Sequence, residues 1–107
     1  MKKKDWKREG FDKVQITYLV STSAELDTPY ADINFNVSQM RVIKKGMDAG
    51  VDVRRFAIPQ FSTQQMGVLL SVLLEKGDIS SLLDPGINAT KMIQIVETKK
   101  RKTKLSS

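Results

Sequence analysis

The sequence predicts an all-α fold built as a small array of repeated units, each a long helix followed by a short helical turn. The segment "FSTQQM" at 61–66 has a near-copy, "FNVSQM", at 35–40 and a more divergent copy, "INATKM", at 87–92. Each copy leads into apolar residues at helical spacing. Self-similarity at a fixed period is typical of stacked helical arrays, which need about three units to bury a continuous core.

An offset of 26 residues aligns these copies well beyond the quoted segments. The aligned positions hold large apolar residues, acidic residues and prolines of the same kind. Apolar side chains at this spacing indicate a buried core more than a ligand-binding stripe. The matched sets are Met40, Met66 and Met92; Phe35, Phe61 and Ile87; Ile43, Leu69 and Ile95; Tyr30, Phe56 and Leu82; Asp52 and Asp78; and Pro59 and Pro85.

The first unit, at about 11–34, is ambiguous in the sequence. Phe11 and Gln15 roughly track Phe35 and Gln39, which favours a degenerate helical unit. The residues at 14–20, however, alternate between β-branched or aromatic and more polar types, a strand pattern. The alternative is therefore an α+β fold with an N-terminal strand at 14–20, which would pair with residues 92–98.

The starts of the later long helices carry a capping signal. Asn36 with Gln39, and Ser62 with Gln65, have the spacing of a capping box, in which a polar N-cap and a Gln three residues later satisfy each other's free backbone donors. Asn88 keeps the cap without the Gln. We expect helices at about 37–49, 63–76 and 89–99.

The ends of these helices and the segments between them also carry local signals. Gly50 and Gly77 stand where a helix ends in a left-handed residue. Between the long helices, Asp52 and Asp78 are natural N-caps for a one-turn helix. The unit boundaries that follow are about 11–34, 35–60, 61–86 and 87–98, which together form a single helical repeat domain at 11–98.

Net positive charge is confined to the two ends of the chain. Residues 1–10 hold five basic and two acidic side chains, and 99–107 hold five basic and none acidic, whereas 11–98 hold eight basic and ten acidic. The sequence therefore predicts a basic N-terminal extension at 1–10, where Trp6 packs locally, and a basic disordered tail at 99–107.

The composition argues against catalysis. The chain has no cysteine and no histidine, which excludes thiolate and imidazole metal sites and every mechanism that uses Cys or a His base. No carboxylate pair or glycine-rich phosphate loop is visible. We expect no enzyme activity, no cofactor and no small-molecule substrate.

The longest apolar run is "VLLSVLL" at 68–74, far short of the roughly 18 residues that span a bilayer. We therefore expect a cytoplasmic protein with no membrane partner.

The sequence also resembles a known repeat family. "QMRVIKKGMDAGVDVRRFAIPQF" at 39–61 is similar to the short 26-residue helical repeat of uncharacterised proteins from Gram-positive bacteria, their phages and conjugative elements. The resemblance covers about 30–99, although the unit at 65–87 has Val72 and Lys76 where the repeat has glycines. It implies a stacked helical array in a mobile genetic element, and it brings no catalytic or ligand-binding residue with it. The matching positions are Gly46, Gly50, Asp52, Val53, Phe56, Ala57 and Pro59.

Two groups of basic residues are candidate contacts for nucleic acid. The first group lies within the domain and would form one patch beside a short helix, suited to phosphate, although a solvated outer face is the alternative reading. The second is the tail, whose cations neutralise phosphates without needing a fold. The candidates are Arg41, Lys44, Lys45, Arg54 and Arg55 in the domain and Lys99, Lys100, Arg101 and Lys102 in the tail.

These observations favour a binding module of a mobile element, with accessory DNA binding as the first hypothesis. The alternative is a protein–protein interaction module, such as a small inhibitor or adaptor that acts on a host or defence protein. The near-neutral charge of 11–98 supports this alternative.

Overall fold

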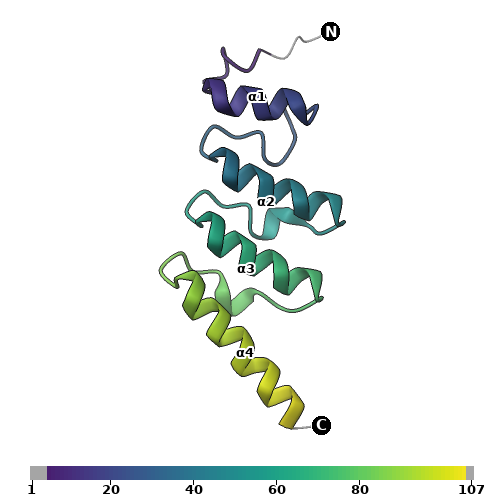
Figure 1. Ribbon diagram of the computed structural model, residues 1–107, viewed down its shortest axis with the longest axis vertical. Helices are drawn as coiled ribbons and strands as arrows, with labels where there is room; N and C mark the ends of the chain where they lie inside the picture. The colour runs from purple at the N-terminus through teal and green to yellow at the C-terminus, as the bar shows by residue number, and fades with distance from the viewer. Residues whose placement is uncertain (1–4, 106–107) are drawn as a thin grey trace.

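The computed structural model describes residues 5–105, which are helical and contain no strand (Figure 1). The all-α prediction is confirmed, and the alternative of a strand at 14–20 is wrong. The elements are α1 (Lys13–Ser21), α2 (Val37–Asp48), the 3-10 helix η1 (Val53–Arg55), α3 (Thr63–Leu74), the 3-10 helix η2 (Ser80–Leu82) and α4 (Ala89–Leu105).

A capping box at Asp12 explains why the first segment is a helix. The Asp12 carboxylate accepts a hydrogen bond from the Gln15 backbone N–H at 2.8 Å, and Oε1 of Gln15 accepts from the Asp12 N–H at 2.9 Å. α2 and α3 begin with the same reciprocal pair. The N-cap satisfies backbone donors that the start of a helix leaves free, and this outweighs the weak alternation of β-branched residues at 14–20.

The helix ends match the sequence prediction at one glycine only. Gly50 has a φ of +79° after α2, as expected for a left-handed terminating residue. After α3, the left-handed residue is Lys76, with a φ of +59°, and the expectation for Gly77 is wrong. Gly77 is required for a different reason, since a Cβ there would lie 2.7 Å from Cγ1 of Val72.

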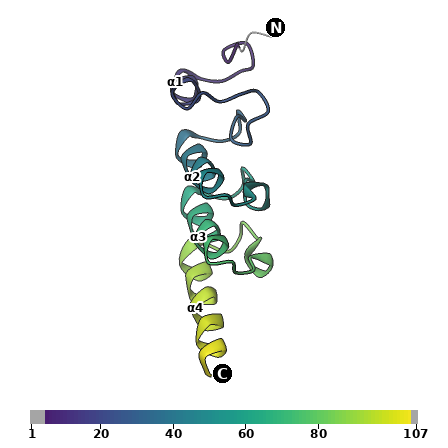
Figure 2. The same ribbon diagram turned by 90° about the vertical axis from the view of Figure 1, so that its right-hand side faces the viewer.

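The long helices form one layer, and the segments that connect them form a second. α2 packs against α1 and α3, and α3 packs against α4. The chain returns after each long helix through a segment on one side of the stack, so η1 and η2 lie in the second layer (Figure 2). The result is an elongated body with extents of 57 × 25 × 18 Å.

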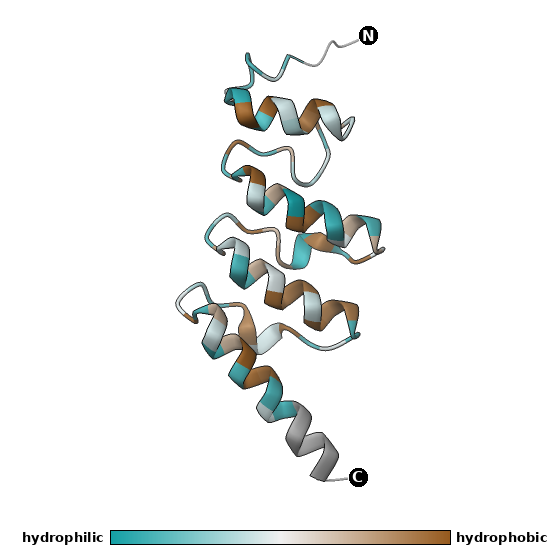
Figure 3. Ribbon diagram, viewed as in Figure 1, coloured by the Kyte–Doolittle hydropathy of each residue, from teal (hydrophilic) through white to brown (hydrophobic). Residues whose placement is uncertain are grey.

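The core lies between these two layers. Phe56 follows η1 and Leu82 ends η2, and both are fully buried against the long helices. α3 supplies Met66 and Leu69 from the middle of the stack, and hydrophobic residues are frequent along its length (Figure 3). Burial of apolar surface between the layers is the main stabilising contribution to such a fold.

Buried glutamines join each unit to the next one. Nε2 of Gln39 donates to the carbonyl oxygens of Pro59 at 3.2 Å and Phe61 at 2.7 Å. Gln15 and Gln65 make the equivalent pairs of bonds to the segments that precede α2 and α4, and all three glutamines are 5–6% exposed. The capping glutamine therefore also satisfies buried carbonyl groups of the following unit, which would otherwise cost stability.

The N-terminal extension packs locally at Trp6, as predicted, whereas the basic segment at the other end is more ordered than the sequence predicts. In the N-terminal extension, Trp6 is buried and packs edge-on against Phe11, with ring centroids 5.4 Å apart. α4 continues through 99–105, so the prediction of a disordered tail is corrected over these residues; 106–107 lie outside the described range. No glycine or proline interrupts 89–105, and cations near the end of a helix interact favourably with its dipole.

Candidate nucleic-acid interface

The candidate cations of α2 are engaged by their neighbours in the helix layer. The guanidinium carbon of Arg41 lies 5.9 Å from the centroid of the Tyr18 ring on α1. Nζ of Lys44 lies 2.7 Å from Oδ2 of Asp48, one turn further along α2. Lys45 is exposed on the same helix.

The pKa values reflect the same contacts. The hydrogen bond to Asp48 raises the pKa of Lys44 above its usual value, because it favours the charged ammonium. Burial raises the pKa of Tyr18, and the nearby charges of Lys44 and Arg41 oppose that rise. These contacts direct Arg41 and Lys44 toward α1, on the opposite side of α2 from α3.

Arg54 and Arg55 lie in the other layer, on η1. Nε of Arg54 is 3.1 Å from Oδ1 of Asp52, and this hydrogen bond lowers the pKa of the Asp52 carboxyl. η1 and α2 belong to different layers (Figure 2), and the single patch of five domain cations stays a prediction. Spacing along a helix predicts that the α2 cations share one face. The positions of Arg54 and Arg55 depend instead on how η1 packs.

The segment around η2 interacts with candidate cations from two other elements. The pKa of Asp78 is lowered first by the hydrogen bonds from the hydroxyl and the backbone N–H of Ser80, and then by the positive charges of Lys99 and Arg55. Nζ of Lys99 also donates a hydrogen bond to the Ser81 hydroxyl at 2.6 Å. η2 is therefore hydrogen-bonded to α4, and the charge of Arg55 on η1 acts on the carboxylate that precedes η2.

A basic edge results, which we define as Arg54 and Arg55 on η1 and Lys99 on α4. Lys100, Arg101 and Lys102 continue the same helix, which extends beyond α3 at the C-terminal end of the stack (Figure 1). Asp52 and Asp78 neutralise part of this charge. A row of cations of this kind can contact successive phosphates without reading base sequence.

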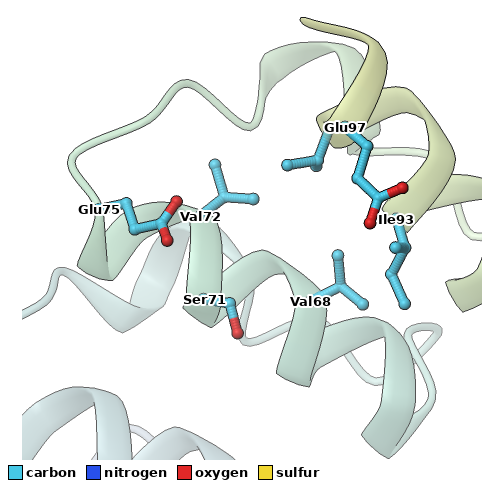
Figure 4. Close-up of a pocket in the computed structure, with 7 residues that line it drawn as sticks. Val68, Ser71, Val72, Glu75, Ile93 and Glu97 are labelled. Carbon is cyan, nitrogen blue, oxygen red and sulfur yellow. The ribbon is translucent and has the colours of Figure 1, made fainter. Parts of the chain in front are cut away.

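Two grooves on the helix layer were not predicted from the sequence. One lies between α3 and α4, with a volume of about 250 Å³ (Figure 4). The other lies between α1 and α2, with a volume of about 350 Å³. Apolar residues line each groove, but their spacing in the sequence assigns them to a buried face and does not show which of them stay exposed between two helices. The α3–α4 groove is lined by Val68, Ser71, Val72, Glu75, Ile93, Val96 and Glu97, and the α1–α2 groove by Lys13, Val14, Thr17, Tyr18, Ser21, Val37 and Arg41.

Residues 5–105 contain no cluster of three or more acidic, His or Cys side chains able to hold a metal ion. Within this same range, every helix is too short or too polar to cross a membrane. No protein-family model, curated protein or solved structure matches the chain. The resemblance to the 26-residue repeat family stays a prediction.

Proposed function

We propose that the protein is a non-enzymatic binding module that binds DNA through phosphate contacts of its basic edge. The observation that supports this proposal is the hydrogen bond from Nζ of Lys99 on α4 to the Ser81 hydroxyl on η2, at 2.6 Å. This bond holds Lys99 in the region where its charge and that of Arg55 both lower the pKa of Asp78.

Binding of this kind depends on charge and is largely independent of base sequence. Each Lys or Arg that neutralises a phosphate releases counterions, so affinity falls as salt concentration rises. The exposed hydroxyl of Ser81 accepts a hydrogen bond from Lys99, so its own hydrogen can be donated to a phosphate oxygen. We expect duplex and single-stranded DNA of equal length to bind with similar salt dependence.

The test measures fluorescence anisotropy of labelled DNA against the full chain over a range of salt concentrations. Arg55→Ala should make the slope of log affinity against log salt shallower by about 0.9 for each lost phosphate contact on duplex DNA. Lys44→Ala is the matched control: it removes the same charge from the helix layer, where Asp48 engages the lysine, and should leave the slope unchanged.

The possible outcomes distinguish failure of the proposed DNA binding from failure of the proposed site. If the full chain does not bind either form of DNA at about 50 mM salt, where exposed charges are weakly screened, DNA binding is excluded. If Arg55→Ala and Lys44→Ala change the slope equally, the chain binds DNA but the basic edge is not its site.

A further inference from the structure

The exposed side of the helix layer carries apolar side chains at both ends of the stack. Val14 on α1 is 66% exposed and Ile93 on α4 is 46% exposed. Each lines one of the two grooves described above, together with half-buried or buried residues of the neighbouring helix: Val37 on α2 in the first, and Val68 and Val72 on α3 in the second. The same face therefore offers an apolar groove near each end.

The two grooves carry opposite charges. The charged residues of the α1–α2 groove are Lys13 and Arg41, and Lys45 lies one turn beyond Arg41 on the same face of α2. The charged residues of the α3–α4 groove are Glu75 and Glu97 (Figure 4). One end of the face is thus complementary to the other end in charge and similar to it in apolar character.

Small residues occupy the middle of this face. A Cβ added to Gly67 on α3 would meet no other atom within 4 Å, so the backbone is open to a neighbour from outside. Ser71 lies one turn further along α3, and its hydroxyl donates back to the Gly67 carbonyl at 2.9 Å. A helix from another molecule could approach α3 closely at this point.

We propose that a second copy of this chain covers the helix layer in a two-fold symmetric dimer. The two-fold axis lies beside α3 and runs parallel to the helices. Along the stack, the helices of the second copy therefore follow each other in the reverse order. This arrangement sets α2 of each copy in the α3–α4 groove of the other, and α4 in the α1–α2 groove. A two-fold interface uses the same patch on both copies, so a face with opposite charges at its ends is complementary to itself.

The arrangement gives each charged contact twice. Lys45 of one copy faces Glu97 of the other, and symmetry repeats the pair at the far end. Val14 and Ile93 are covered at both ends, and α3 meets α3 at Gly67. The molecule extends 57 × 25 Å across the face viewed in Figure 1, so this face has room for the roughly 800 Å² per partner of a standard specific interface. The basic edge takes no part, so this proposal does not rest on DNA binding.

The first test is sedimentation equilibrium of the full chain, up to a concentration of about 1 mM, where even a weak interface is populated. We expect a reversible monomer–dimer equilibrium. Gly67→Leu places a large side chain where the helices meet and should weaken dimerisation at least about tenfold. The variant should still fold, because the site is open and Leu favours a helix more than Gly does; circular dichroism checks this.

The second test uses charge reversal at two exposed residues, Lys45→Glu and Glu97→Lys. Each variant alone places two like-charged pairs in the dimer and should weaken it about tenfold. A mixture of the two variants should form a heterodimer about as tight as the wild-type dimer, since every pair is then of opposite charge. Rescue on mixing is not expected from a change in folding.

A wild-type chain that remains monomeric at about 1 mM overturns the proposal, and the helix layer is then free for a different protein. A dimer that Gly67→Leu leaves unchanged also overturns it, because the contact would lie elsewhere. Failure of the two charge variants to rescue each other would show that Lys45 and Glu97 are not opposed, and the proposed axis would be wrong.

Discussion

Val72 and Gly77 fit together as a large and a small residue at the end of α3. The N–H of Gly77 donates to the Val72 carbonyl at 2.8 Å, and a Cβ on Gly77 would lie 2.7 Å from Cγ1 of Val72. At the 26-residue offset the sizes are exchanged: the N–H of Val51 donates to the carbonyl of Gly46 at 2.9 Å. The ends of α2 and α3 therefore each pair one glycine with one valine, but the two residues exchange positions. The total side-chain volume of the pair is the same at both ends.

The first prediction concerns this pair. Gly77→Ala should lower the free energy of unfolding by about 1–3 kcal/mol, because the new methyl group collides with Val72. In a Val72→Ala background the same change should cost about 1 kcal/mol less, since Cγ1 is gone. Chemical denaturation of the four proteins measures the coupling. Gly67→Ala is the control and should stabilise by about 1 kcal/mol, because its Cβ meets nothing.

The second prediction concerns the buried glutamines. Gln39→Glu should destabilise the protein by about 2–4 kcal/mol, because a carboxylate cannot donate to the carbonyls of Pro59 and Phe61 and repels them instead. Gln64→Glu is the matched control. That residue is exposed in the first turn of α3, where a negative charge is favourable, so no loss is expected. Equal losses in the two variants would contradict the bridging role of Gln39.

The third prediction concerns the left-handed residues that follow the helices. Lys76→Gly should raise the free energy of unfolding by about 0.5–1 kcal/mol, because a φ of +59° strains a residue that has a Cβ. Gly50→Ala should have the opposite effect and cost about 1 kcal/mol, as φ is +79° and no other atom crowds the site. Thermal unfolding of both variants checks the signs, and a loss on Lys76→Gly would show that the lysine side chain contributes more than its backbone strain costs.

The fourth prediction concerns acid stability. The folded-state pKa of Asp78 is lowered, first by the Ser80 hydrogen bonds, below its ordinary value of 3.8. The carboxylate therefore contributes stability at neutral pH, and this contribution is lost as pH falls below about 4 and through the folded-state pKa. At pH 7, Asp78→Asn should be less stable than the wild type. At pH 2, where the wild type has lost this contribution, the variant should be equally stable or more stable. A difference between the two proteins that does not change with pH would contradict this linkage.

Local signals in the sequence are sufficient to predict where α2, α3 and α4 begin. The pairs at Asn36 and Gln39 and at Ser62 and Gln65 are local, because the two partners are three residues apart and meet whenever a helix forms. The spacing of apolar residues after each cap then determined which side of the helix is buried, and the core followed from it. The pair at Asp12 and Gln15 has the same form and is the local signal for the helix at α1.

The surfaces depend on how the two layers pack. The hydrogen bond from Gln39 to Phe61, and the one from Lys99 to Ser81, join residues that are far apart in sequence. No local rule predicts on which side of the stack η1 lies. The spacing of the five domain cations therefore does not show which of them lie in which layer. The helix at 99–105 was missed because a run of cations is typical of disordered tails. Here no glycine or proline ends α4, and the helix continues from a segment already held by packing.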